Sequence, residues 1–160
     1  MTDFGGLLKR LRGADVRFVL VGGFAGTLLG SPRITIDLDI VYARDVDNLT
    51  RLARALEPLS PYLRGAPRGL PFRLDVATLQ RGLNFTLTTD LGDLDLLGEI
   101  AGGGTYEHLV SDAMPVRVFD TDVTVVTLEQ LIHLKRAAGR PKDFEAIAEL
   151  EALLEERQRE

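Results

Sequence analysis

Two pairs of aspartates occur in apolar stretches of the sequence, where a charged carboxylate is unfavourable unless it has a partner or a function. Asp37 and Asp39 flank a leucine in "RITIDLDIV", and Asp93 and Asp95 do the same in "GDLDLL". Residues two apart on a strand share one face and lie about 6.6 Å apart. Two carboxylates at that distance repel by about 2.5 kcal/mol at an effective dielectric near 20, and a cation between them would reverse the sign.

Binding of a divalent cation is the chemistry that such pairs favour. Mg²⁺ prefers oxygen ligands and is usually held by one or two carboxylates with waters and phosphates, while paired ions lie about 4 Å apart. If the two acidic strands are neighbours, three or four carboxylates converge. The alternative is that the pairs are solvent-facing residues of an acidic protein, although Asp is poorly suited to strand interiors. Asp120 and Asp122 fall at an expected hairpin turn, so we assign them no chemistry.

A glycine pair precedes the first acidic strand. Gly22 and Gly23 end an apolar run at residues 16–21 and open a short helix, where backbone N–H groups can meet a phosphate with no Cβ in the way. A Gly-Gly pair at a strand end is also an ordinary turn. The order of strand, glycines, helix and acidic strand within about 25 residues favours an anion held beside a cation.

Hydrophobic periodicity and turn residues predict the elements that must position these groups. Ile34, Ile36, Leu38 and Ile40 form the expected buried face of the acidic strand. Pro and Gly spacing predicts a loop over 60–72. Thr127 and Gln130 fit a capping box that opens a helix closed by Gly139, and Pro141 suits the first turn of a final helix. The expected strands are 16–21, 33–43, 84–90, 92–100 and the hairpin 114–126, and the expected helices are 3–14, 24–30, 45–59, 128–139 and 141–160.

The bulk properties predict one domain of the α/β (α+β) class, a mixed β-sheet flanked by helices with C-terminal helices. With 160 residues and 45% hydrophobic content the chain can bury one core, which we expect over about 14–126, followed by a helical part over about 127–160. There is no cysteine and there are two histidines, so any metal would be held by oxygen. A net charge of -5 argues against broad non-specific binding to nucleic acid. The lack of an apolar stretch of about 18 residues predicts a soluble, cytoplasmic protein.

The ordered motifs resemble the nucleotidyltransferase superfamily of the DNA polymerase β type. Its signature is a hydrophobic residue, Gly, then Gly or Ser, followed by a D-x-D strand, and Val21-Gly22-Gly23 and Asp37-Leu38-Asp39 match it. The segments "GGFAGTLLGSPRITIDLDI" and "LIHLKRAAGRPKDFEAIAEL" are similar to the abortive-infection type IV toxin branch (AbiEii-like) of that superfamily. Gly23 stands where many members have Ser, so a hydroxyl contact to phosphate is missing.

The resemblance implies a role for each motif residue. Asp37, Asp39 and Asp95 would form the acidic triad that binds Mg²⁺ or Mn²⁺, with Asp93 as the fallback third carboxylate. Gly22 and Gly23 would line the triphosphate, Lys135 would contact the phosphates, and Asp143 would lie near the site.

The basic residues admit a second interpretation. Arg33 precedes the acidic strand and could pair with its aspartates, bind the incoming nucleotide or lie on the surface without a role. Lys135 lies in the last turn of a helix, where a cation complements the macrodipole, and it could instead reach the phosphates as a point charge. Arg140 has the same two readings.

The sequence thus favours a minimal nucleotidyltransferase that uses an NTP and Mg²⁺ to modify an acceptor hydroxyl on tRNA, a protein or a small molecule. One carboxylate, Asp95 first, would help to deprotonate that hydroxyl. A toxin role with a cognate antitoxin follows from the resemblance. The alternatives are a catalytically inactive nucleotide-binding or protein-interaction module on the same fold, or another D-x-D enzyme such as a haloacid-dehalogenase-type phosphatase or a sugar-nucleotide transferase.

Overall fold

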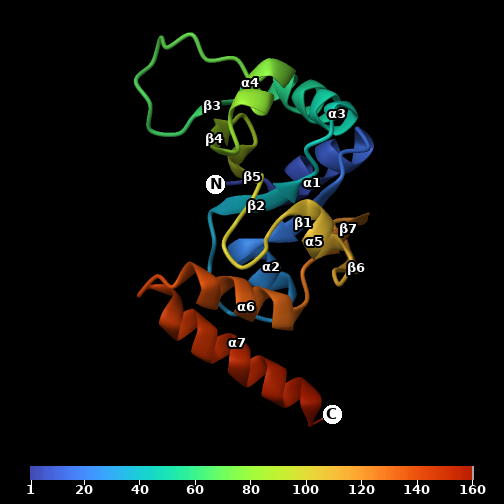
Figure 1. The fold of residues 1–160 in the computed structure, drawn as a ribbon, viewed down its shortest axis with the longest axis vertical. Helices are drawn as coiled ribbons and strands as arrows, with labels where there is room; N and C mark the ends of the chain where they lie inside the picture. Colours follow the sequence, from blue (N-terminus) through green and yellow to red (C-terminus); the bar gives the residue numbers. More distant parts are fainter. Residues whose placement is uncertain (160) are drawn as a thin grey trace.

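The computed structural model describes residues 1–159, which form one seven-stranded mixed sheet with packed helices (Figure 1). The strand order is β3-β4-β5-β2-β1-β7-β6. The strands are β1 (Phe18–Val21), β2 (Asp37–Tyr42), β3 (Tyr62–Leu63), β4 (Asn84–Thr89), β5 (Gly92–Leu97), β6 (Met114–Val118) and β7 (Thr121–Val125). The helices are α1 (Phe4–Gly13), α2 (Gly22–Leu28), α3 (Val46–Leu56), α4 (Val76–Arg81), α5 (Tyr106–Val110), α6 (Leu128–Ala138) and α7 (Asp143–Gln158), with a 3₁₀ turn at Glu57–Leu59.

The centre of the sheet places the two acidic strands side by side. β2 pairs antiparallel with β1 and parallel with β5, and the register sets Asp37 opposite Asp93 and Asp39 opposite Asp95. Leu38 alternates with them on β2 and is fully buried on the other face. The expectation that the two D-x-D strands are neighbours is therefore confirmed.

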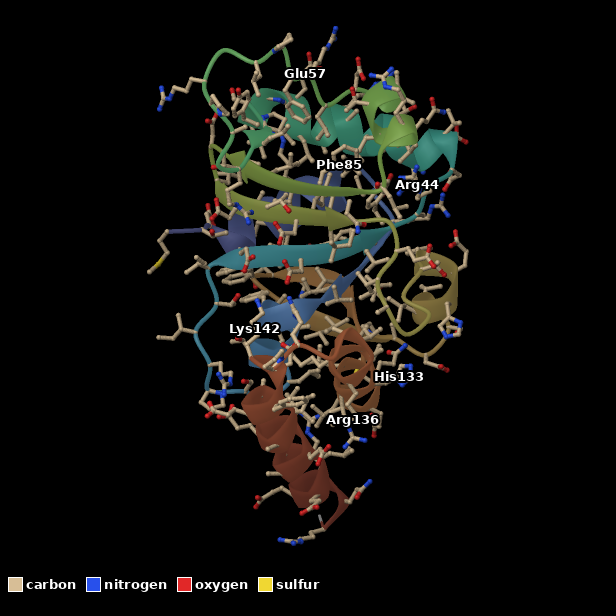
Figure 2. The ribbon with its side chains drawn as sticks, turned by 60° about the vertical axis from the view of Figure 1, so that its left-hand side comes forward. Arg44, Glu57, Phe85, His133, Arg136 and Lys142 are labelled. Atoms are coloured by element: carbon tan, nitrogen blue, oxygen red, sulfur yellow. The ribbon has the colours of Figure 1, made fainter. Side chains whose placement is uncertain are left out.

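Helices pack on this sheet from both ends of the chain. α1 packs on α3 and β7, while α2 packs on β1 and β2 and carries α6, on which α7 lies. α6 and α7 lie at the opposite end of the molecule from α3 and α4 (Figures 1 and 2), with Arg136 at one end and Glu57 at the other. No helix within residues 1–159 combines the length and the apolar character needed to cross a membrane.

Most of the expected elements are present, and the acidic strand differs at its start. It begins at Asp37, four residues later than expected, and Ile34 and Ile36 are 95% and 67% exposed instead of buried. The reason is where the neighbouring strands begin and end. Pairing with β5 begins at Asp37 and β1 ends opposite Asp39, so the residues before Asp37 have no neighbouring strand. The Thr2 hydroxyl donates a hydrogen bond to the Ile36 carbonyl there.

Two further boundaries differ from the sequence prediction. The expected loop over 60–72 contains the two-residue strand β3, which pairs with β4 and is too short to show a periodic pattern. The last helix begins at Asp143, so Pro141 belongs to the preceding turn. Phe144, expected in the apolar stripe of this helix, is 63% exposed, whereas Ile147 is buried. The Thr127–Gln130 capping box and the Gly139 end of α6 are both confirmed.

A buried asparagine joins α3 to the strands that lead toward the acidic groups. The Asn48 side-chain oxygen accepts a hydrogen bond from the Arg17 N–H at 2.7 Å, and its amide group donates to the carbonyls of Arg17 at 3.1 Å and Ala43 at 2.7 Å. Arg17 precedes β1 and Ala43 follows β2. Because Asn48 is completely buried, water cannot replace these bonds.

We therefore predict that Asn48→Leu destabilises the fold by about 3 kcal/mol, because it leaves the Arg17 N–H and the Ala43 carbonyl without a partner, while the Arg17 carbonyl keeps only its bond from the Ala43 N–H. Urea unfolding measures the loss. Arg51→Ala, an exposed change on the same helix, is the control and is expected to stay within about 0.5 kcal/mol of the wild type. Equal stabilities of the two variants would contradict the structural role given to Asn48.

Candidate functional site

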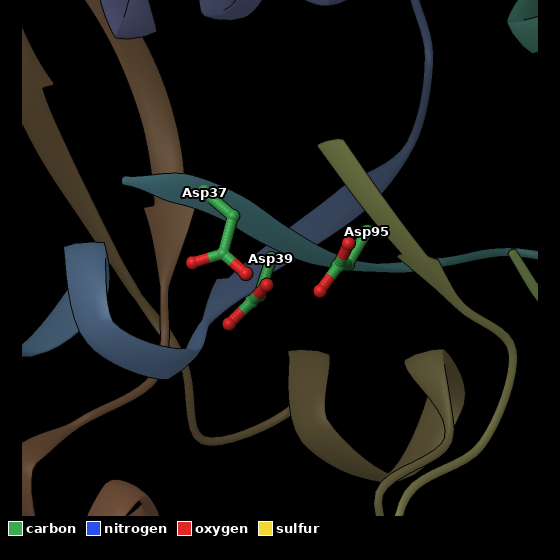
Figure 3. A group of neighbouring side chains, drawn as sticks. All are labelled: Asp37, Asp39 and Asp95. Carbon is green, nitrogen blue, oxygen red and sulfur yellow. The ribbon is translucent and has the colours of Figure 1, made fainter. Parts of the chain in front are cut away.

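Three carboxylates meet on one face of the sheet (Figure 3). Asp37 and Asp39 of β2 and Asp95 of β5 each offer one oxygen, and these oxygens lie within 4.8 Å of one another. Asp93, the fallback third carboxylate, lies outside this group and faces an arginine instead. The parallel β2–β5 register brings the three groups together, since Asp39 and Asp95 are direct neighbours across the ladder.

The three carboxylates are poorly compensated by hydrogen bonds. The Oδ1 atoms of Asp39 and Asp95 are buried and find no hydrogen-bond partner within residues 1–159. Burial raises the pKa of Asp39 to about 8, and the negative charges of Asp37 and Asp95 add to the rise. Burial also raises the pKa of Asp95, against the opposing charge of the Arg64 guanidinium. These groups therefore gain free energy from any cation that reaches them.

The donor set suits a hard divalent cation. Three carboxylates with two unsatisfied buried oxygens match the oxygen coordination that Mg²⁺ and Mn²⁺ prefer, and the group contains neither imidazole nor thiolate. Asp37, Asp39 and Asp95 are thus the side chains that would hold such an ion.

The glycine pair allows the backbone to approach the acidic strand closely. Gly22 has a φ of 72°, and a Cβ at this position would overlap the Asp39 carboxylate. A Cβ at Gly23 would come within 2.8 Å of the Thr35 hydroxyl. That hydroxyl lies 3.3 Å from an Asp37 carboxylate oxygen and donates to it. Glycine is therefore required at the start of α2 by contact with the carboxylates and their support.

A cavity of about 330 Å³ adjoins the acidic group. Gly22, Asp39 and Asp95 line it together with two cationic side chains, Lys135 and Arg140. The rest of the lining is apolar: Val21, Leu97, Ile100, Ala101, Leu131, Leu134 and Ala138. A cavity of this size with apolar walls and a few convergent charges is typical of a small-ligand site.

A buried carboxylate holds the two cations at the cavity. The Asp143 side chain is 6% exposed and lies 3.8 Å from Lys135 Nζ and 2.8 Å from Arg140 Nε. Asp143 itself does not line the cavity, so it lies behind the site and contacts it through Lys135 and Arg140. Lys135 lines the cavity together with Asp39 and Asp95, and its positive charge opposes the rise in the pKa of Asp39.

Arg33 lies apart from the carboxylates of β2. Its guanidinium pairs with Glu149 at 2.8 Å and with Glu145 at 3.5 Å, both on α7. Of the options that the sequence left open for Arg33, pairing with the strand aspartates is therefore not what the structure shows. The residue joins the segment before β2 to the last helix.

Arg64 is the residue at this site that sequence reasoning missed. It directly follows β3, and its guanidinium nitrogens lie 2.9 Å from Asp95, 3.5 Å from Asp93 and 3.8 Å from Asp37. It stands in a segment with two other arginines, Arg68 and Arg73, and no local signal separates them. Only the pairing of β3 with β4, and of β4 with β5, carries Arg64 to the acidic face.

Comparison with known proteins identifies the fold. No protein-family model and no curated protein matches the sequence. Among solved structures, the lincosamide antibiotic adenylyltransferase LnuA with bound lincomycin superposes over 95% of this chain and 98% of its own, with a TM-score of 0.60 and 17% identity. A Thermotoga maritima protein proposed to be a nucleotidyltransferase superposes over 89% of this chain and 86% of its own, with a TM-score of 0.58 and 18% identity. The chain therefore has the mixed-sheet nucleotidyltransferase fold, as its motifs predicted.

Proposed function

We propose that this protein is a nucleotidyltransferase that transfers NMP from an NTP to an acceptor hydroxyl with the help of Mg²⁺ or Mn²⁺. The observation that carries the proposal is the convergence of Asp37, Asp39 and Asp95, whose carboxylate oxygens lie within 4.8 Å of one another. They adjoin a cavity that the cationic side chains of Lys135 and Arg140 also line. The fold shared with LnuA and the Thermotoga protein supports it.

The residues of the site have separate proposed roles in binding the metal, the phosphates and the base. A divalent cation held by the triad would stabilise charge on the attacking and leaving oxygens during in-line attack of the hydroxyl on the α-phosphate, which breaks the α–β phosphate bond and releases pyrophosphate. Gly22 and Gly23 let the phosphates approach the backbone, while Lys135 and Arg140 neutralise them. The apolar walls of the cavity receive the base and exclude water. Arg33 pairs with Glu149 of α7, so its proposed contribution to nucleotide binding is to hold the segment before β2 against that helix.

Asp95 is the proposed proton acceptor for the attacking hydroxyl. Asp95 lines the cavity beside Gly22 and Asp39, so its carboxylate is within reach of an acceptor hydroxyl that binds there. The acceptor hydroxyl belongs to tRNA, a protein or a small molecule. Action as a toxin controlled by an antitoxin is the biological role that the sequence resemblance favours.

The competing proposal is a catalytically inactive nucleotide-binding or protein-interaction module, and its protein-interaction form relies on an outward apolar face of the last helix. Phe144 is exposed on α7, but Ile147 and Leu150 of the same expected stripe are buried. The acidic cluster with its unsatisfied buried oxygens has no purpose in a protein-interaction module, whereas an inactive nucleotide-binding module would use it and is separated from the enzyme by the transfer of label from NTP. We therefore rank the module second.

The first prediction concerns the acidic pair of β2. The double change of Asp37 and Asp39 to Asn removes two of three ligands and is expected to weaken Mn²⁺ binding at least 100-fold and to abolish transfer of label from NTP. Electron paramagnetic resonance of free Mn²⁺ measures the binding. The matched control converts Asp120 and Asp122, a D-x-D pair in the β6–β7 hairpin, to Asn and should change neither quantity more than twofold. Equal effects of the two double variants would count against the site.

The second prediction uses two of the three glycines of α2, Gly22 and Gly26. Gly22→Ala places a Cβ in the Asp39 carboxylate and is expected to lower Mn²⁺ affinity at least tenfold, because that carboxylate must move. Gly26→Ala in the same helix meets side-chain atoms only at 3.6 Å and should leave affinity unchanged. Calorimetric titration of both variants with Mn²⁺ makes the comparison. Retained affinity in Gly22→Ala would show that Asp39 is not a ligand.

The third prediction is a pH dependence that arises from Asp39. The folded state holds the Asp39 proton up to about pH 8, whereas the unfolded chain releases it near the ordinary value of 3.8. Folded protein therefore binds more protons between pH 4 and 8, and stability in EDTA is expected to fall as pH rises through that window.

Asp39→Asn removes the titrating group, so its stability in EDTA should exceed that of the wild type increasingly from pH 5 to pH 8. Urea unfolding at pH 5, 6.5 and 8 measures both proteins. Parallel stability curves would contradict the raised pKa of Asp39.

A further inference from the structure

Four carboxylates, and not three, occupy the acidic face of the sheet. The β2–β5 register sets Asp37 beside Asp93 and Asp39 beside Asp95, so the four groups form a square on two neighbouring strands. Two kinds of positive charge can approach this square. The oxygens that could hold a metal come from Asp37, Asp39 and Asp95, whereas Arg64 pairs with Asp37, Asp93 and Asp95.

The guanidinium of Arg64 is held in place by backbone as well as by charge. Nη2 donates a hydrogen bond to the Leu87 carbonyl at 2.6 Å, and it also lies 2.9 Å from Asp95 Oδ1 in an ion pair that lacks hydrogen-bond geometry. Nε is buried and finds no hydrogen-bond acceptor in the part of the chain that the structure describes. The side chain is 28% exposed. Arg64 is therefore a fixed positive charge whose hydrogen bonds to the carboxylates are not optimised.

This arrangement gives Arg64 and a divalent cation two ligands in common. Both would draw on Asp37 and Asp95, while Asp93 faces Arg64 alone and Asp39 completes the metal group. Like charges so close repel strongly at a partly buried site, because solvent screens them incompletely. A cation bound by the triad must therefore weaken the pairing of Arg64 with Asp37 and Asp95.

We propose that Arg64 is an intramolecular counter-ion that competes with the divalent cation for Asp37 and Asp95 and thereby sets how tightly the cation binds. The inference rests on the proposed function, because it concerns the same metal group. Arg64 stabilises Asp37, Asp93 and Asp95 before the cation arrives, and it keeps only its contacts with Asp93 and the Leu87 carbonyl when the cation is bound. Arg64 does not line the cavity beside the acidic group and acts through the carboxylates, so it is a positioning residue.

Loss of the Arg64 charge should consequently strengthen metal binding. Arg64→Met removes the competing charge and is expected to bind Mn²⁺ at least tenfold more tightly than the wild type. In EDTA the same variant lacks the positive charge that faces Asp37, Asp93 and Asp95, so its melting temperature should be lower than that of the wild type, and the rise on adding Mn²⁺ should be larger. Isothermal titration and thermal unfolding of the full chain measure both quantities.

Three further variants separate charge from structure. Arg64→Lys keeps the charge and should remain within threefold of wild-type affinity. Arg64→Gln is neutral but polar, so it replaces the Met variant if that protein does not fold in EDTA, and it carries the same expected tenfold gain. Arg68→Met removes an arginine of the same segment that forms no ion pair within residues 1–159, and it should leave affinity unchanged.

The outcomes distinguish this inference from the function on which it rests. Neutral variants of Arg64 that bind Mn²⁺ as tightly as the wild type, or more weakly, would overturn the counter-ion role while leaving the metal site intact. A folded wild-type protein that binds no Mn²⁺ would overturn the proposed function and the inference together.

Discussion

The in-register pairing of two acidic strands is the constraint on which the rest of the structure depends. Parallel pairing of β2 with β5 sets four aspartates on one face of the sheet, where repulsion between neighbouring carboxylates destabilises the fold. Burial makes their charged forms still less favourable and raises the pKa of both Asp39 and Asp95. A fold that keeps these charges together must supply positive charge around them and rigid strands beneath them.

The surrounding elements meet both needs. Leu38 and Ile40 are fully buried on the opposite face of β2. The Asn48 side chain joins α3 to the residues next to β1 and β2 through three hydrogen bonds to their backbone. The acidic strand is thus fixed by packing on its other face, so the aspartates cannot relax by moving apart. Because residue 22 is a glycine, no Cβ there prevents the Asp39 carboxylate from lying against the start of α2.

Positive charge reaches the carboxylates from two directions. Arg64 approaches from the β3–β4 side of the sheet, and Lys135 approaches from α6, where Asp143 of α7 holds it with Arg140. The cavity lies on the α6 side and includes Lys135 and Arg140 but not Arg64. A triphosphate in this cavity would meet two cations and the triad, while Arg64 would act on the carboxylates alone. This asymmetry separates the residues proposed to bind substrate from the one proposed to tune the metal.

Sequence alone determined the parts of this protein that depend on neighbours in the chain. The two D-x-D strands, the glycine pair, the capping box of α6 and the overall α/β class follow from side-chain alternation, backbone freedom and helix-end chemistry, all of which act over a few residues. Tertiary structure decided the rest. The exposure of Ile34 and Ile36 depends on where the neighbouring strands end, and the pairing of Arg33 with α7 depends on how distant helices pack. Arg64 reaches the acidic face only because β3 joins the sheet beside β4, a long-range pairing that no local pattern encodes.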